Sequence, residues 1–267
     1  MLKKFAVLLV IFVCLVGGVL CIIPYYSPAE KQGGLSIIKH HDDTIRIAYI
    51  GDSWAHFHED VYCEMDSIIS NETAKPVKVR IKGIGGLTSK YIYDSLCKNE
   101  AMRSVIEWGP DFCFVVAGIN DSDRKMGAGF YKENMGLIID LLLENHIKPI
   151  ILEIPSYDIY SAFKRRSFIG KLRYLLSMFV TQSKMDCIAE YRKAYQDLIE
   201  EQGWNEQVIT ISHQDWNLDG YLDKRGLYND DLIHLNERGY HVLDSCIAHK
   251  IIDYFSSREN HLRAYDR

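Results

Sequence analysis

Five residues spread over the chain are of the types that acyl transfer needs. Ser53 is a candidate nucleophile, and Asp231 and His234 are a candidate carboxylate and base. A serine hydroxyl attacks at neutral pH only when a base accepts its proton, and an imidazole has an ordinary pKa of about 6.5. Gly86 and Asn120 could help to stabilise an oxyanion. Together these residues are the parts that acyl transfer through a serine nucleophile requires.

The spacing of Asp231 and His234 suits a shared task. A carboxylate three residues before the imidazole can hold one ring nitrogen on a tight loop and leave the other free for Ser53. When the acyl carbonyl becomes tetrahedral, its oxygen gains negative charge. The backbone N–H groups of Ser53 and Gly86 and the side-chain amide of Asn120 could receive that charge. Taken singly, each residue could equally fill a turn, a cap or a surface position, so the inference depends on the set.

These residues must be positioned by the elements that precede them. Alternating or continuous apolar runs predict strands over residues 45–53, 77–81, 112–117, 149–154 and 208–211. Helical patterns lie at about 55–69, 89–108, 131–145, 187–202 and 237–255. Strands that alternate with helices in this way predict a parallel sheet covered on both faces. Because parallel strands end at one edge of the sheet, Ser53, Gly86 and Asn120 are expected to lie close together there.

Four short motifs occur in the order in which a known protein family has them. They are Gly51-Asp52-Ser53, Gly85-Gly86-Leu87-Thr88, Gly118-Ile119-Asn120-Asp121 and Asp231-Leu232-Ile233-His234. With them the chain resembles the SGNH, or GDSL-type, hydrolase family from about residue 45 to about residue 255. The resemblance implies an α/β fold, a flavodoxin-like three-layer α/β/α sandwich, and hydrolysis of carboxylic esters. It implies that Ser53 is the nucleophile, that Asp231 and His234 complete a catalytic triad, and that Gly86 and Asn120 contribute to the oxyanion hole.

The chain also departs from the family's pattern. Trp54 follows the serine where a leucine is usual, Gly85 replaces a serine, and Ile81 stands near the place of an upstream asparagine. Residues 51–55 nearly match the G-x-S-x-G elbow of α/β-hydrolases. That fold needs several strands before its elbow, whereas only one predicted strand precedes Ser53. An SGNH-type serine esterase without metal or organic cofactor is therefore the preferred interpretation.

The N-terminal sequence predicts a membrane segment. Lys3 and Lys4 precede an apolar run over residues 5–23, about the length that a membrane-spanning helix needs. Lysines before the run and no comparable cluster after it predict a cytoplasmic N-terminus and a catalytic domain outside the cytoplasm. The alternative is a cleaved signal and secretion. The expected organisation is a single-pass anchor over residues 1–24, a linker over 25–43, a hydrolase domain over 44–258 and a polar tail over 259–267.

Composition excludes some other classes. The chain has 267 residues, 48% of them hydrophobic, and a net charge of -5, which gives no electrostatic case for binding nucleic acid. Five cysteines follow the apolar run without C-x-x-C spacing, so neither a zinc site nor a full disulfide framework is indicated. One or two disulfides are an open alternative in an oxidising compartment. Cys113 is expected to be a small buried hydrophobe. His56 and His58 would point to different sides of a helix, which favours a solvated helix start over a metal site.

The region from residue 157 to residue 184 interleaves basic and apolar side chains. It could be a solvated helix packed on the domain, a lid beside the site, or a surface helix against an anionic membrane.

The expected function is hydrolysis of acyl esters, with O-acetyl groups on an extracytoplasmic glycan as the expected substrate. Transfer of an acyl group to a glycan, cleavage of a lipid or lysophospholipid ester, and an inactive glycan-binding module are the alternatives. The interpretation of the glycan substrate depends mainly on analogy with the family.

Overall fold

The computed structural model describes residues 25–217 and 219–265, and side chains up to residue 257. The predicted anchor over residues 1–24 lies outside the described residues. Within the described ranges, no helix combines the length and the apolar character needed to cross a membrane.

The centre of the domain is one sheet of five parallel strands in the order β2-β1-β3-β4-β5. The strands are β1 Ile45–Gly51, β2 Val77–Gly83, β3 Phe112–Val116, β4 Lys148–Leu152 and β5 Ile209–Ile211. Every residue of β1 and β3 is buried, whereas the edge strand β2 alternates between more and less exposed residues over most of its length. This strand order is that of flavodoxin-like folds, so the predicted α/β class with a parallel sheet is confirmed.

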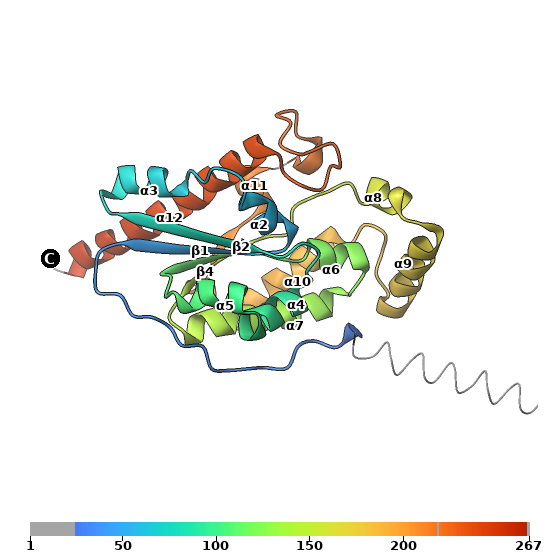
Figure 1. Cartoon of the computed structure of the whole chain (residues 1–267), viewed down its shortest axis with the longest axis horizontal. Coiled ribbons are helices and arrows are strands. Elements are labelled where there is room, and N and C mark those ends of the chain that lie inside the picture. Colours follow the sequence, from blue (N-terminus) through green and yellow to red (C-terminus); the bar gives the residue numbers. More distant parts are fainter. Residues whose placement is uncertain (1–24, 218, 266–267) are drawn as a thin grey trace, which may run out of the picture.

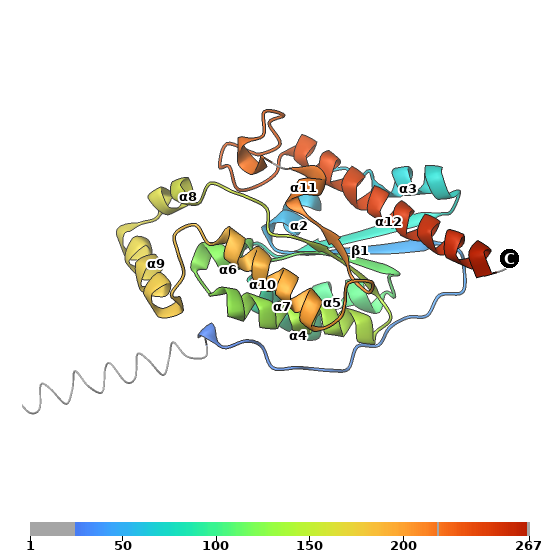
Figure 2. The same cartoon turned by 180° about the vertical axis from the view of Figure 1, so that it is seen from behind.

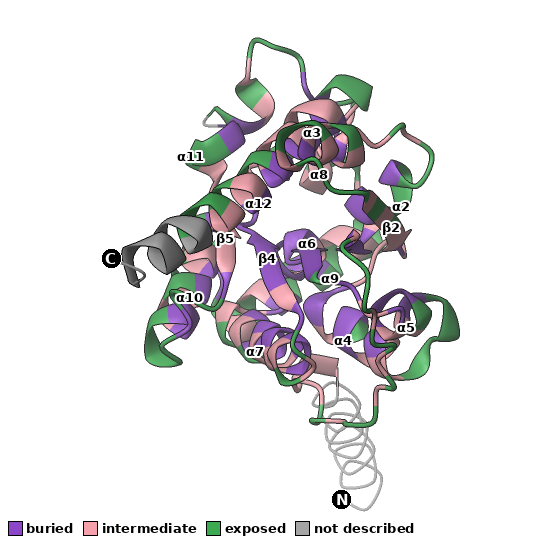
Figure 3. Cartoon of the chain, turned by 90° about the vertical axis from the view of Figure 1, so that its left-hand side faces the viewer, coloured by how far each residue is buried: buried purple, intermediate pink, exposed green. Residues whose placement is uncertain are grey.

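Helices cover both faces of the sheet (Figures 1 and 2). The helices of the described chain are α2 Ser53–His58, α3 Met65–Thr73, α4 Ser89–Lys98, α5 Glu100–Glu107, α6 Ile119–Arg124, α7 Ala128–Glu144, α8 Ile159–Arg165, α9 Phe168–Thr181, α10 Ile188–Glu201, α11 His213–Trp216, the 3₁₀ turn Gly220–Leu222 and α12 Glu237–Tyr265. One layer contains α2, α3, α11 and α12, and the other contains α4, α5, α7 and α10. Buried residues gather between these layers when the sheet is seen end-on (Figure 3).

Several predicted helix boundaries were wrong. The single helix expected over 89–108 is divided at Asn99, whose side chain accepts the N–H groups of Ala101 and Met102 and caps α5. The helix expected over 55–69 is interrupted between α2 and α3, because the Glu59 carboxylate turns back to accept the Gly83 N–H. α6 was not expected at all, and α12 continues into the predicted tail.

The segment over residues 25–43 runs along the layer of α4, α5 and α7 (Figure 1). It has little regular structure, but its backbone bonds to the domain. The Ala29 N–H donates to Asn134 and the Gln32 N–H to the Tyr93 hydroxyl, and the Ile38 N–H donates to the Glu107 carbonyl. These bonds hold the segment against the α/β domain.

Candidate active site

The carboxyl ends of β1, β2 and β3 form the edge where the predicted residues meet. Because β1 lies between β2 and β3, Ser53, the turn containing Gly86, and Asn120 follow three neighbouring strands. The strand order reverses between β1 and β3, and open α/β sheets bind their ligands at such a switch point. Asp231 and His234 lie on the loop before α12, which reaches the same edge.

The structure brings Ser53, His234 and Asp231 into one line of hydrogen bonds. The Ser53 Oγ lies 2.8 Å from His234 Nε2, although 181 positions separate the two residues. On the other side of the ring, His234 Nδ1 lies 2.6 Å from Asp231 Oδ2. A carboxylate accepts from a protonated Nδ1, which leaves Nε2 with the lone pair that can take the serine proton.

The loop around Asp231 fixes its carboxylate. Its second oxygen, Oδ1, accepts the N–H groups of Ile233 and His234, both at 2.9 Å. Partial burial opposes ionisation, but these two N–H groups and the imidazole outweigh it and lower the pKa of Asp231. Asp231 is therefore ionised at neutral pH and aimed at the ring.

A close contact between α2 and β2 sets the position of Ser53. A Cβ atom on Gly83 would lie 1.9 Å from the His56 backbone nitrogen, so only glycine lets the first turn of α2 approach the end of β2. Ser53 is the first residue of α2 rather than the end of a strand. Asp52 caps this helix by accepting the Trp54 N–H at 3.0 Å.

The unusual Trp54 holds the loop that carries His234. Its indole N–H donates to the Ile233 carbonyl at 3.1 Å, and its own carbonyl accepts the Tyr240 hydroxyl of α12 at 2.9 Å. The side chain is fully buried. A leucine could not make the first of these bonds, and the sequence shows only that the residue departs from the family's pattern.

Asn120 points to the start of α2. Its side-chain amide donates to Asp52 Oδ2 at 2.9 Å. Burial raises the pKa of Asp52 to about 7, although the Trp54 N–H and the Asn120 amide both favour its ionised form. The neighbouring Asp121 is also buried and accepts both the N–H and the hydroxyl of Ser89, which ties α6 to the first turn of α4.

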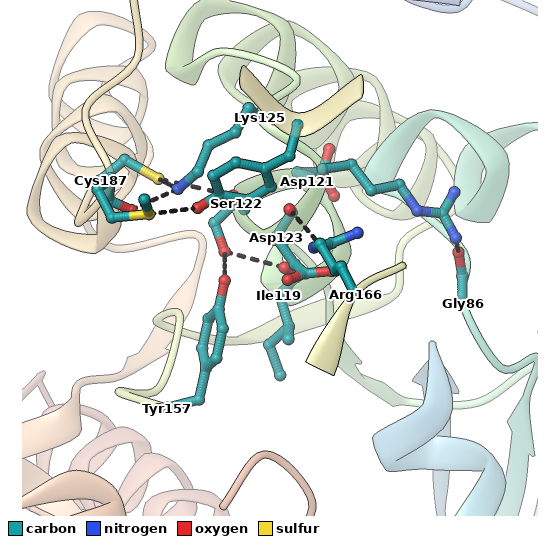
Figure 4. Close-up of polar contacts among 12 residues, drawn as sticks. Gly86, Ile119, Asp121, Ser122, Asp123, Lys125, Tyr157, Arg166 and Cys187 are labelled. Atoms are coloured by element: carbon teal, nitrogen blue, oxygen red, sulfur yellow. Dashed lines mark hydrogen bonds and ion pairs between the residues drawn. The ribbon is translucent and has the colours of Figure 1, made fainter. Parts of the chain in front are cut away.

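Gly86 occupies a turn with a φ of +78°, a conformation that favours glycine. Its carbonyl accepts from the Arg124 guanidinium at 2.6 Å (Figure 4). The glycine turn after β2 is therefore attached to the end of α6.

Further bonds hold α6 in place (Figure 4). The Ser122 hydroxyl lies 3.0 Å from the Tyr157 hydroxyl, and the buried Lys125 ammonium donates to Cys187 Sγ at 3.1 Å. The Asp123 carboxylate pairs with Arg166, which follows the last residue of α8. The sequence does not predict this network, because none of these residues carries a local signal of its partner.

His58 differs from its predicted role. The expectation of a solvated helix start fits His56, whose side chain is 51% exposed, but was wrong for His58, which is fully buried. His58 Nε2 lies 2.7 Å from an Asp244 oxygen on α12. His58, Cys63 and Asp244 have donor atoms within 4.8 Å of one another and could hold a metal ion. The bond to Asp244 satisfies Nε2, whereas His58 Nδ1 is buried without a hydrogen-bond partner among the described residues.

The cysteines form no disulfides among the described residues. Cys63, Cys97, Cys113, Cys187 and Cys246 are all free, and Cys113 is buried in β3 as predicted. Desolvation raises the pKa of the Cys187 thiol, even though the Lys125 ammonium opposes that rise.

Comparison with known families decides the class of the protein. Residues 49–242, more than half of the chain, match the model of the GDSL-like lipase/acylhydrolase family. The chain belongs to this family. The predicted resemblance is therefore confirmed, and so is the predicted class of enzyme, a hydrolase of ester bonds.

Two solved structures have a fold similar to that of this chain. A lipase/acylhydrolase from Enterococcus faecalis superposes with a TM-score of 0.52 at 19% identity, over 78% of this chain and 95% of that one. An acetyl xylan esterase, AlAXEase, superposes with a TM-score of 0.52 at 17% identity, over 76% and 98% of the two chains. Among curated proteins, none matches the sequence.

Proposed function

We propose that the protein is a serine esterase in which Ser53, His234 and Asp231 cleave carboxylic esters through an acyl-serine. One observation carries the proposal: a nucleophile, a base and a carboxylate lie in an unbroken line of hydrogen bonds at the sheet edge. The family supplies the reaction class, and the geometry supports the assignment of these residues to it.

In the first half of the reaction, the Ser53 hydroxyl attacks the ester carbonyl while His234 Nε2 takes its proton. The Asp231 carboxylate stabilises the resulting imidazolium through the bond to Nδ1. The tetrahedral intermediate then collapses. His234 returns the proton to the alcohol oxygen, the ester C–O bond breaks, and the acyl group stays on Ser53.

Three donors can serve the oxyanion. Ser53 opens α2, and the first N–H groups of a helix have no partner within it. The Asn120 amide has two N–H donors, of which one bonds Asp52, so the second is available. The Gly86 N–H completes the proposed set. Loss of one such donor costs about 2.7–4 kcal/mol in other serine hydrolases.

In the second half, water attacks the acyl-serine. His234 takes a proton from the water as it adds to the acyl carbonyl, and the second tetrahedral intermediate releases the carboxylic acid and returns the proton to Ser53. The enzyme is then restored.

A fluorophosphonate probe tests the nucleophile. We expect the wild-type chain to be labelled and Ser53→Ala to stay unlabelled at unchanged thermal stability. Labelling of the alanine variant would assign the nucleophile elsewhere. A folded wild type that resists labelling would favour the alternative of an inactive binding module.

We also propose that the ester is an O-acetyl group on a glycan. The similar fold of an acetyl xylan esterase supports this choice. A cavity of about 290 Å³ adds support, because tyrosine rings and polar groups suit a sugar; Tyr160, Tyr221, Asp186 and Arg192 are among its lining residues. The cavity reaches Tyr157, next to Asp158, whose N–H donates to Leu232 on the loop of the proposed triad.

Release of acetate from acetylated glycans tests this proposal. Short acyl esters and lysophospholipids serve as competing substrates, and preference for either would contradict a glycan. Analysis of the products in the presence of a free sugar acceptor separates hydrolysis from acyl transfer, because a transferase acetylates the sugar instead of releasing acetate.

The proposed location is the outer face of a membrane, with the apolar run over residues 5–23 as a single-pass anchor. Alkaline carbonate extraction of membranes that contain the full chain tests the anchor. Retention in the membrane fraction supports it, whereas release of a shortened chain would support signal cleavage and secretion.

A further inference from the structure

Helix α9 presents an apolar face to solvent. Six of its side chains are more than half exposed, and two phenylalanines at opposite ends reach 83% and 84%. The six are Phe168, Ile169, Leu172, Leu176, Phe179 and Val180. Large apolar groups gathered on one exposed helix mark a surface that contacts another apolar phase.

The apolar side chains form one stripe. At about 100° per residue, the six residues lie within an arc of about 120° on the helix. Lys171 falls on one flank of that arc and Arg173 on the other. The buried residues Tyr174 and Ser177 lie on the opposite side of the helix, toward the domain. A stripe flanked by basic side chains has the form of a helix that lies in a membrane interface, with its charged ends reaching the headgroups.

The charged residues in the sequence of α8 and α9 all have one sign. Between residues 159 and 185 the sequence contains six lysines and arginines and no aspartate or glutamate, in a chain whose net charge is -5. Three of the six are paired within the protein. Arg165 donates to the Asp231 carbonyl, Arg166 pairs with Asp123, and Lys184 pairs with Glu190. The remaining positive charge complements an anionic surface.

The described chain begins beside this helix. The Tyr26 hydroxyl donates to Ser177 Oγ at 2.7 Å, and Figures 1 and 2 both place the start of the described chain next to α9. In the sequence, Tyr26 comes three residues after the apolar run that ends at residue 23. A membrane holding that run would therefore meet the domain at α9.

We propose that α9 docks in the interface of an anionic lipid bilayer, with its apolar stripe among the acyl chains and with Lys171 and Arg173 at the headgroups. A second copy of the chain is a poorer occupant, because a symmetric contact through this helix would bring the two basic flanks together. The docking needs no catalytic step and stands apart from the proposed esterase.

The bonds of Arg165 and Arg166 connect the proposed docking helix to the candidate active site. They attach the end of α8, directly before α9, to the Asp231 loop and to α6, which also carries Asn120. Docking through α9 would hold the candidate site at a fixed height above the bilayer surface.

Tryptophan quenching in vesicles tests the proposal with the full chain. Phe179→Trp places a reporter in the stripe, and Ile38→Trp is the matched control. Ile38 is 56% exposed, and its N–H bonds to Glu107, the last residue of α5. Figure 1 shows α5 and α9 well apart on the domain. Both variants are reconstituted in phosphatidylcholine–phosphatidylglycerol vesicles with brominated acyl chains, and the wild-type signal is subtracted. We expect the bromine to remove most of the fluorescence that Trp adds at position 179 and little of that at position 38.

Equal quenching of the two reporters would overturn the proposal, and so would a chain that does not float with the vesicles at all. Loss of both flanking charges, in Lys171→Gln with Arg173→Gln, should weaken the quenching at position 179. Unchanged quenching in that variant would refute the anionic preference. Labelling of Ser53 by the fluorophosphonate probe, measured on the same samples, reports the proposed esterase separately.

Discussion

Replacing Asp231 with asparagine tests how the imidazole is oriented. The asparagine oxygen can still accept the N–H groups of Ile233 and His234, which the Asp231 Oδ1 accepts at 2.9 Å, so the loop should keep its shape. The amide nitrogen would then face His234 Nδ1 and donate to it. That contact places the ring proton on Nε2, which lies 2.8 Å from the Ser53 hydroxyl and could no longer accept its proton.

The size of the effect follows from this change of tautomer. In a triad with a buried aspartate, the same substitution lowers kcat by about 10⁴, or roughly 5.4 kcal/mol at 1.36 kcal/mol for each factor of ten. The Asp231 side chain is 39% exposed, so water can partly replace its interaction with the imidazolium. We therefore expect a fall in kcat of about 10³ to 10⁴ with little change in KM.

The assay is the release of a chromogenic alcohol from a short acyl ester. The matched control is Asp230→Asn, which removes the same charge from the exposed residue directly before Asp231. The rate of this variant should stay within about twofold of wild type. A rate for Asp231→Asn within about tenfold of wild type, in a folded variant, would refute the assigned role and mean that another group orients the ring.

Three further predictions concern the support of the site. Trp54→Phe loses the bond to the Ile233 carbonyl, which is worth about 1 kcal/mol, so kcat should fall by roughly fivefold at unchanged KM. An unchanged kcat would show that Trp54 does not position the His234 loop. His58→Ala leaves the buried Asp244 without its imidazole partner and should lower the free energy of unfolding in urea by about 3 kcal/mol or more, whereas a loss below about 1 kcal/mol would contradict this. Since burial raises the pKa of Asp52 from 3.8 to about 7, the folded protein retains a proton that the unfolded chain releases, and stability should fall as pH rises between these values. Asp52→Asn should remove that part of the fall, roughly 3 kcal/mol between about pH 5 and about pH 8, when urea unfolding at these two pH values is compared with wild type; parallel pH profiles would show that Asp52 is already ionised.

The sequence allowed the fold class to be predicted because its signals are local. Apolar runs such as the one in β3, separated by helical periodicity, require a parallel sheet covered on both faces. Helix boundaries were less predictable. The Asn99 cap and the inward turn of Glu59 divide two expected helices through side-chain bonds that hydrophobic periodicity does not reveal.

The candidate site was accessible from the sequence only as a set of parts. Motif order predicted which residues to examine, and the rule that parallel strands end at one edge predicted that Ser53 and Asn120 would be neighbours. The bond from Trp54 to Ile233 and the pairing of His58 with Asp244 join residues 179 and 186 positions apart. Such pairs leave no periodic trace, because their geometry is set by packing between layers.

By itself, the sequence determined which side chains each face of each strand and helix presents, and hence the α/β class. The order of its four motifs indicated the family and the candidate chemistry. The tertiary structure decided where those faces point. The apolar stripe of α9 has the composition of a core-facing helix, yet the fold turns Tyr174 inward and leaves Phe179 in solvent. The same stripe can face a core or a membrane, and only the contacts on the other side of the helix distinguish the two.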